Sequence, residues 1–112
     1  MKFRNLILIA LGIAYSCVAT KQEFDKAHQE VENRLHVIIG YINDNDSDPS
    51  LRRVEAVNFL ENLTGIMSES DGNDIGKMDP TENDYQKWNK WYLLNKSRVY
   101  WDGKAAKVRL IE

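Results

Sequence analysis

A cluster of aromatic residues near the carboxyl end restricts the possible folds of this chain more than any other feature. Six of its eight Trp and Tyr residues lie between residues 85 and 103, in the stretch YQKWNKWYLLNKSRVYWDG. Its single cysteine, Cys17, has no partner for an internal disulfide. A domain of about 100 residues buries only some three-fifths to two-thirds of its surface. Without a disulfide, such a domain needs large aromatic side chains in its core.

The aromatic residues between 85 and 95 fall on one side of a predicted helix. At about 100° per residue they occupy an arc of roughly 120°, and the intervening Lys, Gln and Asn residues lie outside it. We therefore expect Trp88 and Tyr92 to be core residues. Tyr85 and Trp91, at the two edges of the arc, should be partly buried. Trp101 follows the helix and should help a C-terminal hairpin dock on the helices.

Two earlier segments also have helical patterns. Apolar residues recur at spacings of three and four over residues 21–42, which predicts an amphipathic helix. Its opposite, solvated face is expected to carry Lys26, Glu30, Asn33 and Arg34. A second helix should begin at Asp48-Pro49 and end near Thr64, with Gly65 as a left-handed cap. Its apolar arc is wide, so we expect this second helix to be the central and most buried one.

A third helix and a hairpin complete the predicted fold. Thr81 or Asp79 should cap a helix that continues to Asn95. Residues 98–102 and 108–111 have the composition of two short strands, joined by a loop that begins at Asp102-Gly103. The expected fold is mainly α, a small three-helix domain with a short C-terminal β-hairpin, preceded by a signal peptide.

The first residues resemble a secretory signal. Lys2 and Arg4 precede an eight-residue apolar run, Leu6 to Ile13, which is too short to span a membrane. Ala14-Tyr15-Ser16-Cys17 is similar to a bacterial lipobox, which predicts a signal of residues 1–16 and lipidation of Cys17. Cleavage after residue 19 is the alternative. The single helical domain then comprises residues 20–112. We expect a lipoprotein on the periplasmic side of the cell envelope or at the outer membrane, or else a soluble periplasmic protein.

The charge balance limits the partners. The chain has 15 Lys and Arg against 17 Asp and Glu. Without Lys2 and Arg4 the balance is 13 against 17, a net charge of −4. No block of basic residues remains, so we expect no nucleic-acid partner. With neither a basic amphipathic face nor a second apolar run, membrane attachment is expected through the lipid only.

An acidic segment between the first two helices has part of a calcium-binding pattern. The spacing of an EF-hand loop is met by four residues: Asp44, Asp46, Asp48 and Glu55. Pro49 occupies the position where the sharp turn of that loop needs glycine. We therefore favour a loop that caps the second helix, with calcium as the alternative and no other cofactor expected.

Residues 66–79 form the longest segment without a helical or strand pattern. Loops of this length in small domains are functional or simply mobile. The candidate interaction loop contains Ser68, Glu69, Asp71, Asn73 and Asp74.

Catalytic motifs are absent from the sequence. The only cysteine lies in the signal region, and no G-x-S-x-G elbow, H-E-x-x-H motif or phosphate-binding glycine loop is present. His28 and His36 are eight residues apart on different faces of one predicted helix. We therefore expect that the protein is not an enzyme.

Residues 59–102, FLENLTG…PTENDYQKWNKWYLLNKSRVYWD, resemble a module of an uncharacterised family of short exported or lipid-anchored bacterial proteins. Its hallmarks are LTG, a variable loop, a W-x-x-W-Y helix, and then N-K and Y-W-D. Part of this pattern is also similar to terminal segments of bacterial HEAT-like repeat proteins. The resemblance implies a helical fold and an envelope location, and it brings no catalytic residues.

Two classes of function fit these observations. The first is an envelope-tethered interaction module that binds another envelope protein. The second is a small-ligand binder, either of a sugar through the aromatic residues or of calcium through the segment 44–55. A sugar platform needs exposed rings, whereas the helical arc predicts buried ones, so the exposure of the aromatic residues separates the two.

Overall fold

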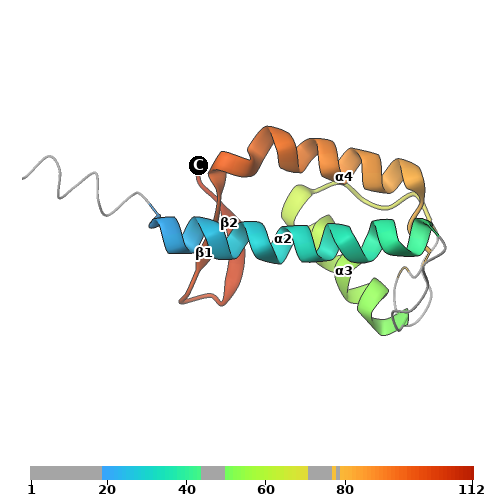
Figure 1. The fold of residues 1–112 in the computed structure, drawn as a ribbon, viewed down its shortest axis with the longest axis horizontal. Helices are drawn as coiled ribbons and strands as arrows, with labels where there is room; N and C mark the ends of the chain where they lie inside the picture. Colours follow the sequence, from blue (N-terminus) through green and yellow to red (C-terminus); the bar gives the residue numbers. More distant parts are fainter. Residues whose placement is uncertain (1–18, 44–49, 71–76, 78) are drawn as a thin grey trace, which may run out of the picture.

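The computed structural model describes residues 19–43, 50–70, 77 and 79–112. Within these residues three α-helices precede a short 3-10 turn and a two-stranded hairpin (Figure 1). The elements are α2 (Lys21–Ile42), α3 (Ser50–Thr64), α4 (Glu82–Asn95), η1 (Lys96–Arg98), β1 (Val99–Asp102) and β2 (Lys107–Leu110). The mainly α architecture with a C-terminal hairpin is therefore confirmed.

Two of the helices begin at reciprocal caps. The hydroxyl of Thr20 accepts a hydrogen bond from the amide of Glu23, whose carboxylate accepts one from the amide of Thr20. Thr81 and Asp84 repeat this arrangement at the start of α4, so Thr81 is the cap rather than Asp79. Each cap satisfies two of the amides that a helix start leaves unpaired.

The end of α3 is set by Gly65. Its φ of 74° lies in the left-handed region, where a side chain would be strained, and its amide donates to the carbonyl of Glu61 at 2.9 Å. The left-handed cap predicted at this position is confirmed.

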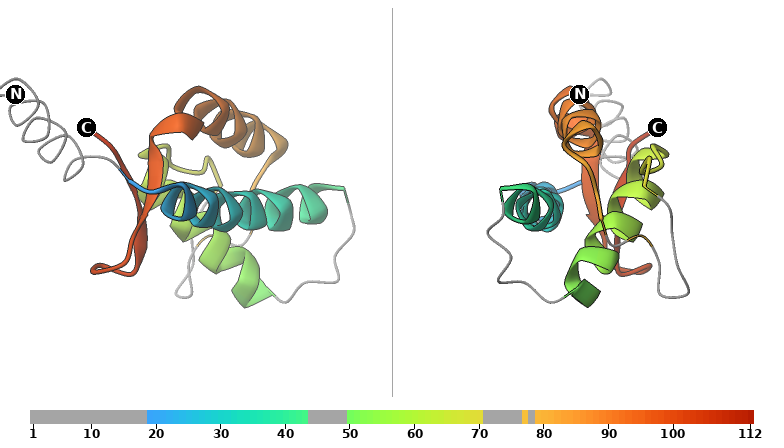
Figure 2. Two further views of the ribbon diagram at one scale, coloured as in Figure 1. Left: turned by 60° about the vertical axis from the view of Figure 1, so that its left-hand side comes forward. Right: turned by 90° about the vertical axis from the view of Figure 1, so that its right-hand side faces the viewer.

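The central helix is α2, which packs against α3, α4 and both strands. Figure 1 shows α2 along the length of the domain, and the end-on view in Figure 2 shows α2, α3 and α4 at the corners of a triangle. The expectation that helix 50–64 would be central is therefore wrong, whereas the expectation that it would be the most buried is confirmed over the described residues, since α3 has six buried residues against four in α2 and three in α4. The buried face of α3 is wide because it includes the charged Arg53 and Glu61 beside its apolar residues.

The hairpin docks on the first turns of α2. β1 and β2 are antiparallel, with Trp101 opposite Val108, and the buried Val99 and Val108 join the core. The carboxylate of Asp102 accepts from the amides of Lys104 (3.0 Å) and Ala105 (3.2 Å), which orders the turn. A two-stranded hairpin is marginal alone, so its order depends on this docking.

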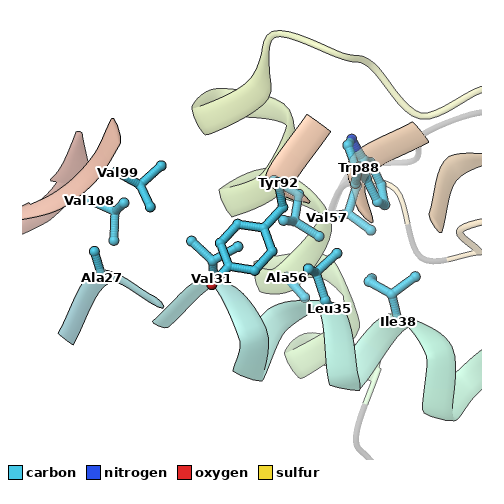
Figure 3. Packing of buried hydrophobic residues seen from close by; sticks show 11 residues of the cluster. Ala27, Val31, Leu35, Ile38, Ala56, Val57, Trp88, Tyr92, Val99 and Val108 are labelled. Carbon is cyan, nitrogen blue, oxygen red and sulfur yellow. The ribbon is translucent and has the colours of Figure 1, made fainter. Parts of the chain in front are cut away.

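The core lies where α2, α3, α4 and the hairpin meet, and Figure 3 shows their side chains pointing toward one another. Trp88 is fully buried and Tyr92 is 3% exposed. Tyr85, Trp91 and Trp101 are partly buried and pack against this cluster. For Tyr85, Trp88, Trp91 and Tyr92 these are the positions that the helical arc assigns. The indole N–H of Trp88 donates to the carbonyl of Ile66 at 2.9 Å, so its burial leaves no unpaired donor.

Candidate interaction surface

Two adjacent leucines of α4 are exposed to solvent. Leu93 is 66% exposed and Leu94 is 72% exposed. The helical wheel that turns Trp88 and Tyr92 inward turns these two leucines outward, because they lie about 100° and 200° further round the helix than Tyr92. This surface could have been found from the sequence by following the same arc two residues further.

Leu93 lines a groove of about 340 Å³ between α2 and α4. The groove also contains Leu35, Ile39, Tyr85 and Tyr92, so its base and walls are largely apolar. Its polar members are Glu32, His36, Asn89 and Lys96. The arrangement combines an apolar centre with a charged rim, as protein interfaces do.

Hydrogen bonds between α2 and the end of α4 hold one end of the groove. The hydroxyl of Tyr92 donates to the Glu32 carboxylate at 2.5 Å, and the Lys96 ammonium lies 3.7 Å from the same carboxylate. Burial and the hydrogen bond to Glu32 raise the pKa of Tyr92, so this tyrosine stays a neutral donor. His28 donates from Nε2 to the carbonyl of Lys96 at 2.7 Å. The two groove walls are therefore fixed to each other.

A second groove, between α2 and α3, contains the exposed Leu51. Charged residues dominate it, since Arg34, Arg52 and Glu55 share its lining. The α2–α4 groove is the more apolar of the two, and the exposed Leu93 lines it; the exposed Leu94 is the next residue, about 100° further round α4.

The described part of the candidate interaction loop is tied to the domain. Asp84 is 2% exposed, and its carboxylate accepts from the Ser68 hydroxyl and from the Glu69 amide at 3.0 Å. The same carboxylate completes the Thr81 cap. One buried side chain therefore fixes both the loop and the start of α4. The pattern Thr81-x-x-Asp84 is a capping-box signature that marks this acid in the sequence.

Glu61 makes a second tie to the loop. Its carboxylate accepts from the amide of Ser68 at 2.8 Å and from the ammonium of Lys77 at 3.0 Å. Lys77 also donates to the carbonyl of Ser68 at 3.0 Å. On the helical wheel Glu61 lies between Val54 and Val57, inside the buried arc of α3, and this position explains why it turns inward.

These contacts correct the expected role of Ser68, which is buried and therefore not available to a partner. Glu69 is exposed and accepts from Thr81 at 2.6 Å and from Asn83 at 3.0 Å, so its place on an interaction surface stays a prediction. These two hydrogen bonds lower the pKa of Glu69 and keep it ionised. The other predicted members, Asp71, Asn73 and Asp74, lie outside the described residues.

Glu55, one of the four predicted calcium ligands, forms an ion pair with Arg34. Both carboxylate oxygens of Glu55 accept from Arg34, at 2.5, 3.0 and 3.2 Å, and Arg34 also pairs with Glu30. The guanidinium lies 4.4 Å from the ring centre of Phe59. Arg34 was expected on a solvated face, and that expectation is wrong, because it joins α2 to α3. The remaining predicted ligands, Asp44, Asp46 and Asp48, lie outside the described residues.

The exposure of the aromatic residues bears on sugar stacking. A stacking platform needs an open ring face, and the burial of Trp88 and Tyr92 removes both from such a role. The ammonium of Lys26 lies 4.5 Å from the ring centre of Trp101 and covers one side of it.

The remaining predicted sites concern the N-terminus and metals. Cys17, the predicted lipidation site, lies outside the described residues. Among the residues that the structure describes, no helix has the length and apolar character to cross a bilayer. Over the same residues, His, Cys, Asp and Glu side chains form no group of three able to hold a metal ion.

Comparison of the chain with protein-family models, with curated proteins and with solved structures finds no match.

Proposed function

We propose that this domain is an interaction module of the bacterial cell envelope, which binds another envelope protein through the α2–α4 groove and the neighbouring exposed leucines. The observation that carries this proposal is the exposure of Leu93 and Leu94, at 66% and 72%. Single exposed apolar residues are ordinary, but two adjacent ones, of which Leu93 lines an apolar groove, are characteristic of binding surfaces.

The partner is expected to present apolar side chains on a helix. The groove runs between two packed helices, and a third helix can lay its apolar face into such a groove. Burial of a leucine contributes about 1.5–3 kcal/mol, so the two leucines together can supply much of a micromolar interaction. His36 and Asn89 offer hydrogen-bonding groups to the partner, whereas the charges of Glu32 and Lys96 are paired with each other.

The rigidity of the groove supports the same function. Its walls are joined by the hydrogen bonds from Tyr92 to Glu32 and from His28 to Lys96. A surface that is already ordered loses less conformational entropy on binding than a mobile loop does. For this reason we place the contact on α4 rather than on the loop that contains Ser68.

Photo-crosslinking inside cells tests the proposal. A photoreactive amino acid is placed at position 93 of the full chain and, as a matched control, at position 51. Leu51 is as exposed as Leu93, at 66%, but lies on α3. We expect a discrete crosslinked protein from position 93 and none from position 51. Crosslinks from position 51 alone, or the same set from both positions, would contradict the proposal.

The envelope location is proposed from the signal sequence and the unpaired Cys17. A lipid chain contributes about 0.8 kcal/mol for each buried methylene, so two or more chains would hold the domain at a membrane. We expect Cys17→Ser to release the protein from the membrane fraction or to block its processing. Cell fractionation and the mass of the mature protein measure this. Wild-type protein that is soluble and begins at Thr20 would show that Cys17 is not an anchor.

A further inference from the structure

Basic residues gather at one end of the molecule. The start of α2, η1 and the hairpin lie together at this end (Figures 1 and 2). Residues 20–26 and 96–112 carry seven Lys and Arg against four Asp and Glu, a net charge of +3. Residues 27–95 carry six against thirteen, a net charge of −7. Eight of those thirteen acids lie among the residues that the structure describes, so the described part of 27–95 carries a net charge of −2 and the positive excess lies at the end formed by the start of α2, η1 and the hairpin. We call the part formed by residues 20–26 and 96–112 the basic end.

Several charges at the basic end are available to a partner. Lys104 and Lys107, at the tip of the hairpin, are exposed, and neither forms an ion pair with another residue that the structure describes. Arg98 donates to the carbonyl of Ile111 at 3.0 Å, a contact that leaves its positive charge unneutralised. These three cations come from η1, the turn and β2, so the fold collects them from separate places in the sequence.

Three of the four acids at this end make local contacts, and the fourth, Glu112, is exposed. Asp102 accepts from the amides of the turn and from Arg109 at 3.2 Å, and these contacts lower the pKa of its carboxyl group. Glu23 caps α2, and Asp25 pairs with Lys21 at 2.8 Å. The free lysines therefore dominate the outward charge of the hairpin.

The aromatic residues of β1 add amphipathic surface. Tyr100 and Trp101 are partly exposed, and the ammonium of Lys26 lies over the ring of Trp101. Tyr and Trp side chains combine an apolar ring with a polar O–H or N–H group. Such side chains are enriched at the boundary between lipid and water.

We infer that the basic end is a membrane-facing surface that binds the headgroups of anionic phospholipids. Lys107 and Arg109 also line a groove of about 780 Å³ at this end, but Glu23 and Glu112 share its lining, so the groove does not offer a purely cationic pocket to one discrete anion. Lys104 lies outside that groove on the exposed turn, which suits a layer of headgroups. The acidic body is repelled by the same layer, so the domain would stand on its basic end.

The point at which the chain enters the domain agrees with this orientation. Thr20 caps α2 at the basic end and follows Cys17 by three residues, an extended reach of about 10 Å. This distance is close to the screening length of about 8 Å at physiological salt. This step rests on the proposed lipidation of Cys17, whereas the separation of charge does not.

The test measures how fast individual lysines are acetylated. The full chain is reconstituted into vesicles of phosphatidylcholine alone or with one-third phosphatidylglycerol, treated with an acetylating reagent and analysed by mass spectrometry. We expect Lys104 and Lys107 to react about fivefold more slowly on the anionic vesicles, because each basic residue near such a surface gains about 1 kcal/mol. Lys87 and Lys90, exposed on α4, are internal controls and should not change.

Salt and paired variants complete the test. Protection should disappear at about 1 M salt, where the screening length is about 3 Å. Arg98→Ala should reduce the protection of Lys104 and Lys107, while Lys87→Ala with Lys90→Ala should preserve it. Equal acetylation of Lys104 and Lys107 on both vesicles would overturn the inference. So would equal slowing of Lys87 and Lys90, since the contact would not then belong to the basic end. Both outcomes are independent of the leucine surface of α4.

Discussion

The Trp88→Ala variant is expected to lose about 3–5 kcal/mol of the free energy of unfolding, the usual range for removing a buried tryptophan. Trp88 is fully buried where α4 meets the rest of the core, and its indole N–H is bonded to the carbonyl of Ile66. A small domain is stable by about 5–15 kcal/mol in total, so this variant should be marginal or unfolded. Urea denaturation followed by circular dichroism measures the loss.

Two other variants show what Trp88 contributes. Trp91→Ala removes the same kind of side chain from a partly exposed position and should have a clearly smaller effect. Trp88→Phe keeps most of the apolar volume but leaves the Ile66 carbonyl without its donor, a loss of about 1–3 kcal/mol. A Trp88→Ala variant that keeps its melting temperature but no longer binds a glycan or a partner would contradict the core role.

The Asp84→Ala variant is expected to lose about 2–4 kcal/mol. It removes half of the cap of α4, which alone contributes about 0.5–2 kcal/mol. It also leaves the Ser68 hydroxyl and the Glu69 amide without the acceptor that they use inside the protein. Thermal denaturation should show the loss, and hydrogen exchange at Glu69 should become faster.

Glu82→Ala is the matched control for Asp84. Glu82 is also an acid in the first turn of α4, but it is exposed, so its removal should change stability by only about 0.3–1 kcal/mol through the helix dipole. Equal effects of the two substitutions would show that Asp84 acts only as a charge near the helix start, and would refute its role in holding the loop.

The local parts of the fold follow from the sequence. Spacings of three and four residues locate the three helices, and the aromatic arc identifies Trp88 and Tyr92 as buried. Gly65 marks the end of α3 because only glycine adopts a positive φ without strain. The sequence Asp102-Gly103 marks the hairpin turn, and each observed strand boundary lies within one residue of the predicted one.

The parts that depend on tertiary packing do not follow so directly. A wide apolar arc on residues 50–64 suggested a central helix, but the order of packing around α2 is decided by all the elements together. The pair between Arg34 and Glu55 joins residues 21 positions apart, and no helical pattern marks it. The basic end escapes a search for charged blocks because its residues come from distant segments.

The central claim is that Leu93 and Leu94 bind another envelope protein. The direct measurement is the dissociation constant between this protein and the partner identified by crosslinking at position 93. Leu93→Ser with Leu94→Ser should weaken binding about 100-fold, because two leucines at the centre of an interface contribute about 3 kcal/mol. Leu51→Ser should leave the affinity within about twofold, and the melting temperatures should stay close to wild type, since all three leucines are exposed. Unchanged affinity in the double variant would contradict the claim.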